Sequence, residues 1–149
     1  MRFRAEIVAA ATGGWLRGPD VEIDGVSFDS RSIRPGQLFV PIVAGRDGHE
    51  FIAGALERGA SAYLTSQPAV GGTAIEVPDT LRALMALARA QRATFDGSVI
   101  GVTGSVGKTS TKDLAWAALA ASKRTWASER SFNNEIGRAS CRERVCFAV

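Results

Sequence analysis

Residues 101–109 read Gly-Val-Thr-Gly-Ser-Val-Gly-Lys-Thr. An apolar run over residues 98–103 leads into this stretch and predicts a buried strand, and a helical pattern begins at Lys108. A glycine-rich turn between a strand and a helix favours a bound anion, because glycine lets backbone N–H groups approach it and the helix N-terminus attracts negative charge. The sequence therefore predicts a strand–loop–helix unit that binds the phosphates of a nucleoside triphosphate.

The spacing of the glycines in this unit departs from the strict phosphate-loop pattern. That pattern places a glycine five positions before Gly107, where this chain has Val102. The lysine and the hydroxyl residue nevertheless follow in the required order. We expect Lys108 to neutralise the β- and γ-phosphates and Thr109 to hold Mg²⁺ through its hydroxyl. The alternative is a glycine-rich turn that binds no ligand.

The charge and composition of the 149-residue chain argue against two kinds of partner. The formal net charge is +3, but residues 138–149 contribute two of these charges through three arginines and one glutamate. The rest of the chain offers no basic patch, so we expect no nucleic-acid partner. No apolar run approaches the ~18 residues of a membrane helix, and the N-terminus has no secretory apolar core. We therefore expect no membrane span and a cytoplasmic location.

The last residues of the chain differ from the rest in composition. Residues 136–145 read Ile-Gly-Arg-Ala-Ser-Cys-Arg-Glu-Arg-Val, which one reading frame of a common sequencing-library adapter would encode. Both cysteines, Cys141 and Cys146, also lie here. We expect residues 138–149 to be a non-native tail and leave them out of functional reasoning. The alternative is a genuine arginine-rich C-terminal helix.

The remaining pattern alternates helices with strands. We expect helices over residues 3–11, 50–58, from Asp79 to about residue 94, and from Lys108 to about residue 121. We expect strands over residues 21–28, 37–43, 62–65, 73–77, 98–103 and 124–127. This alternation predicts an α/β fold, and the break in pattern near residue 96 predicts a domain boundary there.

The part of the chain that follows residue 96 is short for such a fold. A phosphate-binding α/β domain needs several further strands to bury its first strand on both faces. Only about forty residues lie between residue 96 and the unusual tail. We therefore expect a small N-terminal α/β substrate domain, followed by the truncated start of a phosphate-loop α/β ATPase domain. We also expect apolar surface to be exposed on the strand and helix of the second domain.

Three motifs that lie apart in the sequence together indicate a resemblance to a known family. The first is Asp29-Ser30-Arg31, and the second is Asp47-Gly48-His49. The third combines the phosphate-loop residues and the following Thr111-Lys112 with Ser-Phe-Asn-Asn-Glu-Ile-Gly at 131–137. Together, over about residues 1–137, they resemble the Mur ligases, the ATP-dependent amide ligases that build the peptidoglycan stem peptide.

The resemblance implies two domains with different ligands. It implies that residues 1–96 bind a UDP-muramoyl-peptide and that residues 97–137 begin the central ATP-binding domain. The implied substrate-binding residues are Ser30, Arg31, Asp47, Gly48, His49, Asn133 and Asn134. Solvated turns are the alternative for the Asp-Ser-Arg and Asn-Asn segments. For the histidine the alternative is a surface or helix-capping role, and we assign it no general-base function.

The resemblance also implies a set of residues for ATP and Mg²⁺. The implied nucleotide-binding residues are Gly104, Ser105, Val106, Gly107, Lys108, Thr109 and Ser110. Lys108 and Thr109 are the implied catalytic residues, and Thr109 is the implied metal ligand. Ser110 and Thr111 are weaker candidates, since they could simply begin the helix, and Lys112 could be only a solvated helix residue.

Within the family, the third motif is most similar to members that join D-alanyl-D-alanine to UDP-N-acetylmuramoyl-tripeptide through an acyl phosphate. The resemblance places the Mg²⁺-binding glutamate and a further domain beyond residue 137, so we expect no ligase turnover from this chain. We also expect a monomer. Three alternatives stay open. They are a family member that adds the third stem-peptide residue, a non-catalytic UDP-muramoyl-peptide-binding module, and an unrelated phosphate-loop kinase or GTPase.

Overall fold

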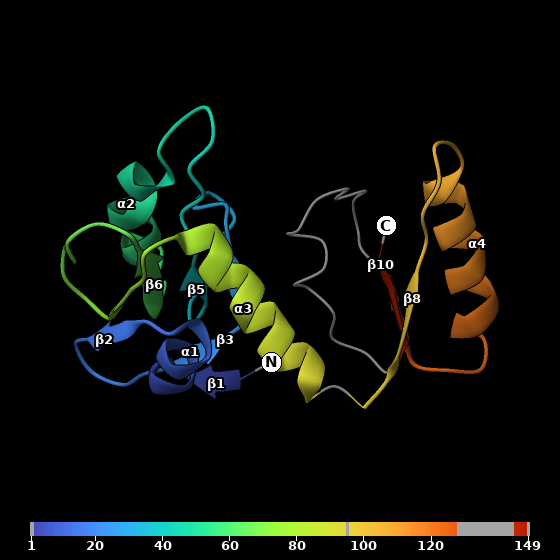
Figure 1. The fold of residues 1–149 in the computed structure, drawn as a ribbon, viewed down its shortest axis with the longest axis horizontal. Coiled ribbons are helices and arrows are strands. Elements are labelled where there is room, and N and C mark those ends of the chain that lie inside the picture. The colour runs from blue at the N-terminus through green and yellow to red at the C-terminus, as the bar shows by residue number, and fades with distance from the viewer. Residues whose placement is uncertain (1, 95, 128–144, 149) are drawn as a thin grey trace. The chain divides into compact units, whose positions relative to one another are not determined.

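A computed structural model describes residues 2–94, 96–127 and 145–148, the last four as backbone only. The chain divides into two compact units, residues 1–87 and 88–149, which are described separately (Figure 1). Helices and strands alternate in the first unit and again in the second. The predicted α/β class is therefore confirmed. The division falls inside a helix that extends past residue 87, and the domain boundary after residue 96 stays a prediction.

The first unit is built around a five-stranded sheet with the order β2-β7-β6-β5-β4. Strands β4, β5, β6 and β7 pair in parallel, and the edge strand β2 runs antiparallel to β7. The bounds of these strands are β2 Trp15–Arg17, β4 Val26–Ser27, β5 Leu38–Phe39, β6 Ala62–Thr65 and β7 Ala74–Glu76. The parallel pairing places the carboxyl ends of four strands at one edge of the sheet.

Both faces of this sheet are buried. Phe39, Tyr63 and Ala74 lie side by side in register and pack with helix α2 (Ile52–Glu57), which contributes Ile52 and Ala55 to one apolar cluster. Neighbouring strand residues point to the opposite face, and Leu38, Leu64 and Ile75 are fully buried there. Helix α1 (Ala5–Thr12) contacts β7. A sheet covered on both faces explains why its short strands are almost wholly apolar.

The N-terminal prediction of a helix over residues 3–11 is wrong at its start. Arg2–Arg4 forms strand β1, which pairs antiparallel with β3 (Glu22–Asp24), and α1 begins only at Ala5. The buried side chains Phe3 and Ile23 lie opposite each other in this ribbon. The cross-strand contact therefore outweighs local helix propensity at the first residues.

Two other strand predictions need correction. The strand expected over residues 21–28 is interrupted at Gly25, which has φ +94°, so β3 and β4 belong to different sheets. The strand expected over 37–43 is limited to β5, because the chain then turns at Pro41 into the next loop. Strand β2 was not anticipated, since three residues with an exposed Trp15 give too short a pattern to recognise.

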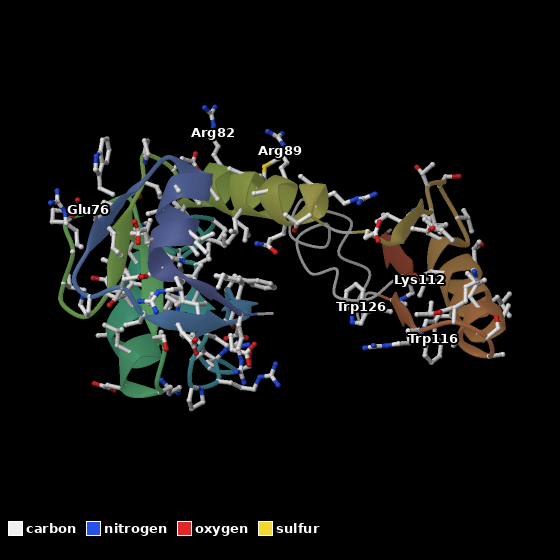
Figure 2. All side chains as sticks on the ribbon, turned by 90° about the horizontal axis from the view of Figure 1, so that it is seen from below. Glu76, Arg82, Arg89, Lys112, Trp116 and Trp126 are labelled. Atoms are coloured by element: carbon white, nitrogen blue, oxygen red, sulfur yellow. The ribbon has the colours of Figure 1, made fainter. Side chains whose placement is uncertain are left out.

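The predicted helices are confirmed, with small changes in their bounds. The 3-10 helix η1 (Gly48–Phe51) precedes α2, and Phe51 at its end is exposed. Helix α3 (Thr80–Ala93) begins after Asp79, whose carboxylate accepts a hydrogen bond from Arg82 N at 2.9 Å. Figure 2 shows Arg82 and Arg89 extending from the exposed side of α3.

The second unit contains the predicted strand–loop–helix sequence. Its described elements are β8 Ser98–Gly101, α4 Lys108–Ala120, β9 Thr125–Ala127 and β10 Val145–Ala148, with β10 paired in parallel between β8 and β9. The prediction that residues 98–103 form a buried strand is wrong about burial, because Val99 and Ile100 are each 38% exposed. On α4, Leu114 and Trp116 are also exposed, as expected for a sheet of few strands. The foreign origin of residues 138–149 stays a prediction.

Candidate functional site

The predicted substrate-binding residues of the first unit gather at the carboxyl edge of its parallel sheet. The Asp29–Ser30–Arg31 turn follows β4, and the loop that contains Asp47, Gly48 and His49 follows β5. Because β4 and β5 are parallel neighbours, both loops leave the sheet at the same edge. Crevices outside the carboxyl ends of parallel strands are the usual ligand sites of α/β sheets. Asn133 and Asn134 lie outside the described residues.

The Asp29–Ser30–Arg31 segment forms a turn. The Asp29 carboxylate accepts hydrogen bonds from Arg31 N at 3.0 Å and from Arg31 Nε and Nη2 at 2.9 Å each. These hydrogen bonds, together with the negative charge of Asp29, raise the pKa of the Arg31 guanidinium above its usual value. The Arg31 side chain is nevertheless 85% exposed. The turn thus presents an oriented cation to solvent, which suits a diphosphate or a carboxylate.

Gly48 lets the second loop pack directly on the chain that follows β5. Its N–H donates to Ile42 O at 3.1 Å. A Cβ at this position would lie 2.6 Å from Ile42 N and 2.7 Å from Ile42 O, closer than side-chain carbons approach backbone atoms. This close approach is the physical reason for glycine between Asp47 and His49.

His49 is buried and both of its ring nitrogens have partners. Nδ1 lies 2.5 Å from Asp47 Oδ1, and Nε2 accepts a hydrogen bond from Ser66 N at 3.1 Å. The ring therefore carries its proton on Nδ1 when neutral, because Nε2 acts as the acceptor. The alternative of a surface histidine is wrong, since its side chain is only 4% exposed. His49 connects the loop after β5 to the end of β6.

The Asp47 carboxylate accepts hydrogen bonds from its own loop and from the chain after β6. The backbone N–H of His49, then its side chain, and also Gln67 hold the pKa of Asp47 below its usual value. Gln67 Nε2 donates to Asp47 Oδ2 at 2.8 Å. Ser66 and Gln67 were missed by the sequence analysis. Their position immediately after a strand, at the edge where the other loops lie, would have been the signal once β5 and β6 were known to be parallel.

The phosphate-loop unit has the local geometry that the sequence predicts. Gly104 and Gly107 have φ of +152° and +79°, and Gly107 precedes the first residue of α4. Lys108 Nζ donates to Gly104 O at 2.6 Å, which folds the lysine back over the loop. The first N–H groups of a helix have no partner inside it, so those after Gly107 can face an anion. Two glycines in the left-handed region, a lysine over the loop and a helix N-terminus form an arrangement that fits nucleotide phosphates.

Lys112 is buried, so the alternative of a solvated helix residue is wrong. It is 4% exposed, and its Nζ lies 3.2 Å from Asp113 Oδ1. Helix α4 contacts β9 and β10, which covers part of its surface. Trp116 of the same helix donates to Thr125 O at 3.4 Å, so α4 is also tied to the start of β9 (Figure 2).

Comparison with known proteins gives one family match and a set of similar ligases. Residues 22–92 match the model described as Mur ligase family, catalytic domain. A curated relative from Bacillus subtilis, UDP-N-acetylmuramoyl-tripeptide–D-alanyl-D-alanine ligase, is 41% identical over 138 residues, covering 87% of this chain. The ligase of the same name from Escherichia coli is 37% identical over 126 residues, covering 83% of this chain. The chain spans about 30% of the length of the Bacillus relative and 28% of the Escherichia relative.

Solved structures show the same likeness. MurF from Acinetobacter baumannii superposes with a TM-score of 0.89 at 26% identity, covering 99% of this chain and 35% of that one. A MurF ligase from Thermotoga maritima in complex with ADP superposes with a TM-score of 0.69 at 27% identity, covering 83% of this chain and 31% of that one.

The first unit therefore has a parallel sheet with polar loops at its carboxyl edge, a phosphate-loop unit follows it, and residues 22–92 resemble the Mur ligase family. Among members of that family, it is similar to the UDP-N-acetylmuramoyl-tripeptide–D-alanyl-D-alanine ligases. The resemblance inferred from the three motifs is thereby confirmed.

Proposed function

We propose that this chain is part of an ATP-dependent ligase that joins D-alanyl-D-alanine to UDP-N-acetylmuramoyl-tripeptide during peptidoglycan synthesis. The observation that carries the proposal is the 41% identity to the Bacillus subtilis ligase, which extends over 138 residues and so spans both units. The geometry supports it, because each unit holds a candidate site of the corresponding chemistry.

In the proposed function the first unit binds the UDP-muramoyl-peptide. Arg31 would pair with a diphosphate or carboxylate oxygen, and Ser30 and the loop at Gly48 would add hydrogen bonds. The exposure of the Arg31 side chain and the placement of both loops at one sheet edge support this assignment. We assign Asp47 and His49 to the same site, where their contacts to each other shape the loop. For Asn133 and Asn134, which lie outside the described residues, substrate binding stays a prediction.

The second unit, in this proposal, binds ATP along residues 104–110. Lys108 would move from Gly104 O to the β- and γ-phosphates, and the N–H groups at the start of α4 would donate to phosphate oxygens. The ADP bound by the Thermotoga maritima relative supports nucleotide binding here. The hydroxyl of Thr109 would hold Mg²⁺, an ion that neutralises developing phosphate charge when bound.

The proposed reaction proceeds in two steps. A carboxylate oxygen of the tripeptide attacks the γ-phosphorus of ATP, and ADP leaves, which forms an acyl phosphate. The amine of D-alanyl-D-alanine then attacks the acyl carbon, loses a proton and displaces inorganic phosphate, which forms the amide. Phosphoryl transfer needs mainly positioning and charge neutralisation, which Lys108 and the loop N–H groups are placed to supply.

Two binding measurements test this proposal on the full chain. Calorimetric titration with UDP-N-acetylmuramoyl-tripeptide should give saturable binding that weakens markedly in Arg31→Ala. Titration with UDP-N-acetylmuramoyl-dipeptide separates the main alternative, since a ligase that adds the third residue would prefer this shorter substrate. Preference for the dipeptide would overturn the assignment to the D-alanyl-D-alanine ligases, and absence of binding to either would overturn the substrate site.

We also propose a cytoplasmic location, because UDP-linked precursors and ATP are cytoplasmic substrates. We further propose that the protein is a monomer. The described residues contain no helix that is long and apolar enough to cross a membrane. Sedimentation of the full chain would test its oligomeric state.

A further inference from the structure

The carboxylate of Asp47 has partners both in its own loop and in the chain that follows β6. Its Oδ1 accepts from His49 N at 3.0 Å and contacts His49 Nδ1, while its Oδ2 accepts from Gln67 Nε2 at 2.8 Å. A free carboxylate at this edge would also repel the diphosphate of the proposed ligand. Both arguments indicate that Asp47 fixes the loop and does not itself bind the anion.

Gln67 is held firmly enough to act as the outer anchor of this loop. The hydroxyl of Thr65, a residue only 1% exposed at the end of β6, donates to Gln67 O at 2.9 Å and accepts from Gln67 N at 3.0 Å. These two bonds fix the backbone of Gln67 relative to the sheet. The Gln67 side chain then spans twenty residues of sequence to reach Asp47.

The neighbouring residue supplies a second connection to the same loop. Ser66 N donates to His49 Nε2 at 3.1 Å, and the Ser66 hydroxyl lies 3.2 Å from the same nitrogen. The chain after β6 therefore contacts both Asp47 and His49. Because Gly48 lies between them and packs on Ile42, these contacts clamp the loop against the end of β5.

We propose that Gln67 is a positioning residue for the UDP-muramoyl-peptide site, acting through Asp47 to hold the loop at residues 46–48 in its binding conformation. The inference rests on the proposed function of this site and adds to it a residue that follows a third strand, β6. Gln67 is exposed and lies outside the apolar cluster of Phe39, Tyr63 and Ala74, so its removal should affect the loop more than the stability of the unit.

The first test compares Gln67→Ala with Val70→Ala, a control in the same connection whose side chain is 68% exposed. Gln67→Ala should weaken binding of UDP-N-acetylmuramoyl-tripeptide about 3- to 10-fold, with the melting temperature unchanged. Val70→Ala should bind like the wild type. In an Asp47→Ala background, Gln67→Ala should have no further effect, because the two residues act through one contact.

A second variant gives a signature that a merely structural role would not produce. Gln67→Glu places two carboxylates against each other, which raises the pKa of one of them. The affinity of Gln67→Glu for UDP-N-acetylmuramoyl-tripeptide, relative to the wild type, should therefore be low near about pH 7.5. It should recover toward about pH 5, because one carboxyl then binds a proton and donates a hydrogen bond to the other. A constant ratio across this range would overturn the inference.

Amide hydrogen exchange tests the role of Gln67 independently of the proposed function. If Gln67 anchors the loop, the Gly48 amide should exchange faster in Gln67→Ala than in the wild type or in Val70→Ala. Should the wild type fail to bind the tripeptide precursor, the proposed function falls, and the exchange rates still decide whether Gln67 holds the loop. Normal binding and unchanged exchange in Gln67→Ala would overturn the inference alone.

Discussion

At the scale of single residues, the two candidate sites depend on backbone positions that only glycine occupies well. Gly104 and Gly107 need positive φ, whereas Gly48 needs space, because its backbone lies against Ile42. The amino-acid sequence does not reveal which of these two reasons applies to each glycine. Their different reasons become visible only in the structure, and they lead to different expectations for substitution.

Substitution of Gly48 by alanine should destabilise the first unit by about 1–3 kcal/mol, because the added Cβ would overlap backbone atoms of Ile42 that cannot move independently. Urea unfolding of the variant measures this loss. Gly45→Ala is the matched control, since nothing lies within 4 Å of its Cβ position. It should change the free energy of unfolding by less than about 0.5 kcal/mol. Equal losses in the two variants would contradict the packing argument.

Lys108→Ala should weaken ATP binding by about 10-fold or more, since it removes the cation that the phosphate loop places beside Gly104. Lys123→Ala, which removes an exposed lysine beyond the end of α4, should leave ATP affinity unchanged. Fluorescence titration with a labelled ATP analogue measures both. ATP affinity that is the same in Lys108→Ala as in the wild type would contradict nucleotide binding at this loop.

At the scale of elements, helix boundaries follow local chemistry more closely than strand boundaries do. The start of α3 was predicted from Asp79, whose side chain accepts from Arg82 N, and the start of α4 from Gly107 and Lys108. Strand bounds depend instead on a partner elsewhere in the chain. The single strand expected over residues 21–28 became two because β3 pairs with β1 and β4 pairs with β5.

Asp79→Ala should cost about 1 kcal/mol of unfolding free energy, because the first turn of α3 loses its side-chain cap. Asp79→Ser should retain most of the stability, since serine also caps helices. Arg82→Ala removes the exposed ion pair with Asp79 at 3.9 Å but keeps the cap, so it should have little effect. Thermal unfolding of the three variants distinguishes the cap from the ion pair. A larger loss in Arg82→Ala than in Asp79→Ala would refute this explanation.

At the scale of the whole molecule, hydrogen bonds to two aspartates link stability to pH. Asp20 accepts from Glu6 N and pairs with Arg4, and Asp47 accepts from His49 and Gln67, so the pKa of each carboxyl lies below its usual value. A lowered folded-state pKa gives stability that is present above the unfolded pKa of about 4 and is lost as the pH falls through the folded-state value.

We therefore expect the melting temperature of the first unit to fall as the pH decreases below about 4. The double variant Asp20→Asn, Asp47→Asn should show a smaller decrease over the same range, starting from a lower melting temperature near neutral pH. Calorimetry at a series of pH values measures both slopes. Parallel curves for the wild type and the double variant would show that these carboxyls do not supply the acid sensitivity.

The strand–loop–helix unit with Lys108, the α/β class and most helices could be predicted from the amino-acid pattern alone. Each of these depends on residues within a few positions of one another, so a local pattern suffices. The parallel pairing of β4, β5 and β6, which brings Gln67 to Asp47 and Ser66 to His49, could be seen only in the folded chain. The folded chain also shows that Lys112 is buried while Val99 and Ile100 are exposed. Strand direction and burial depend on what packs against a segment, and that neighbour lies far along the chain.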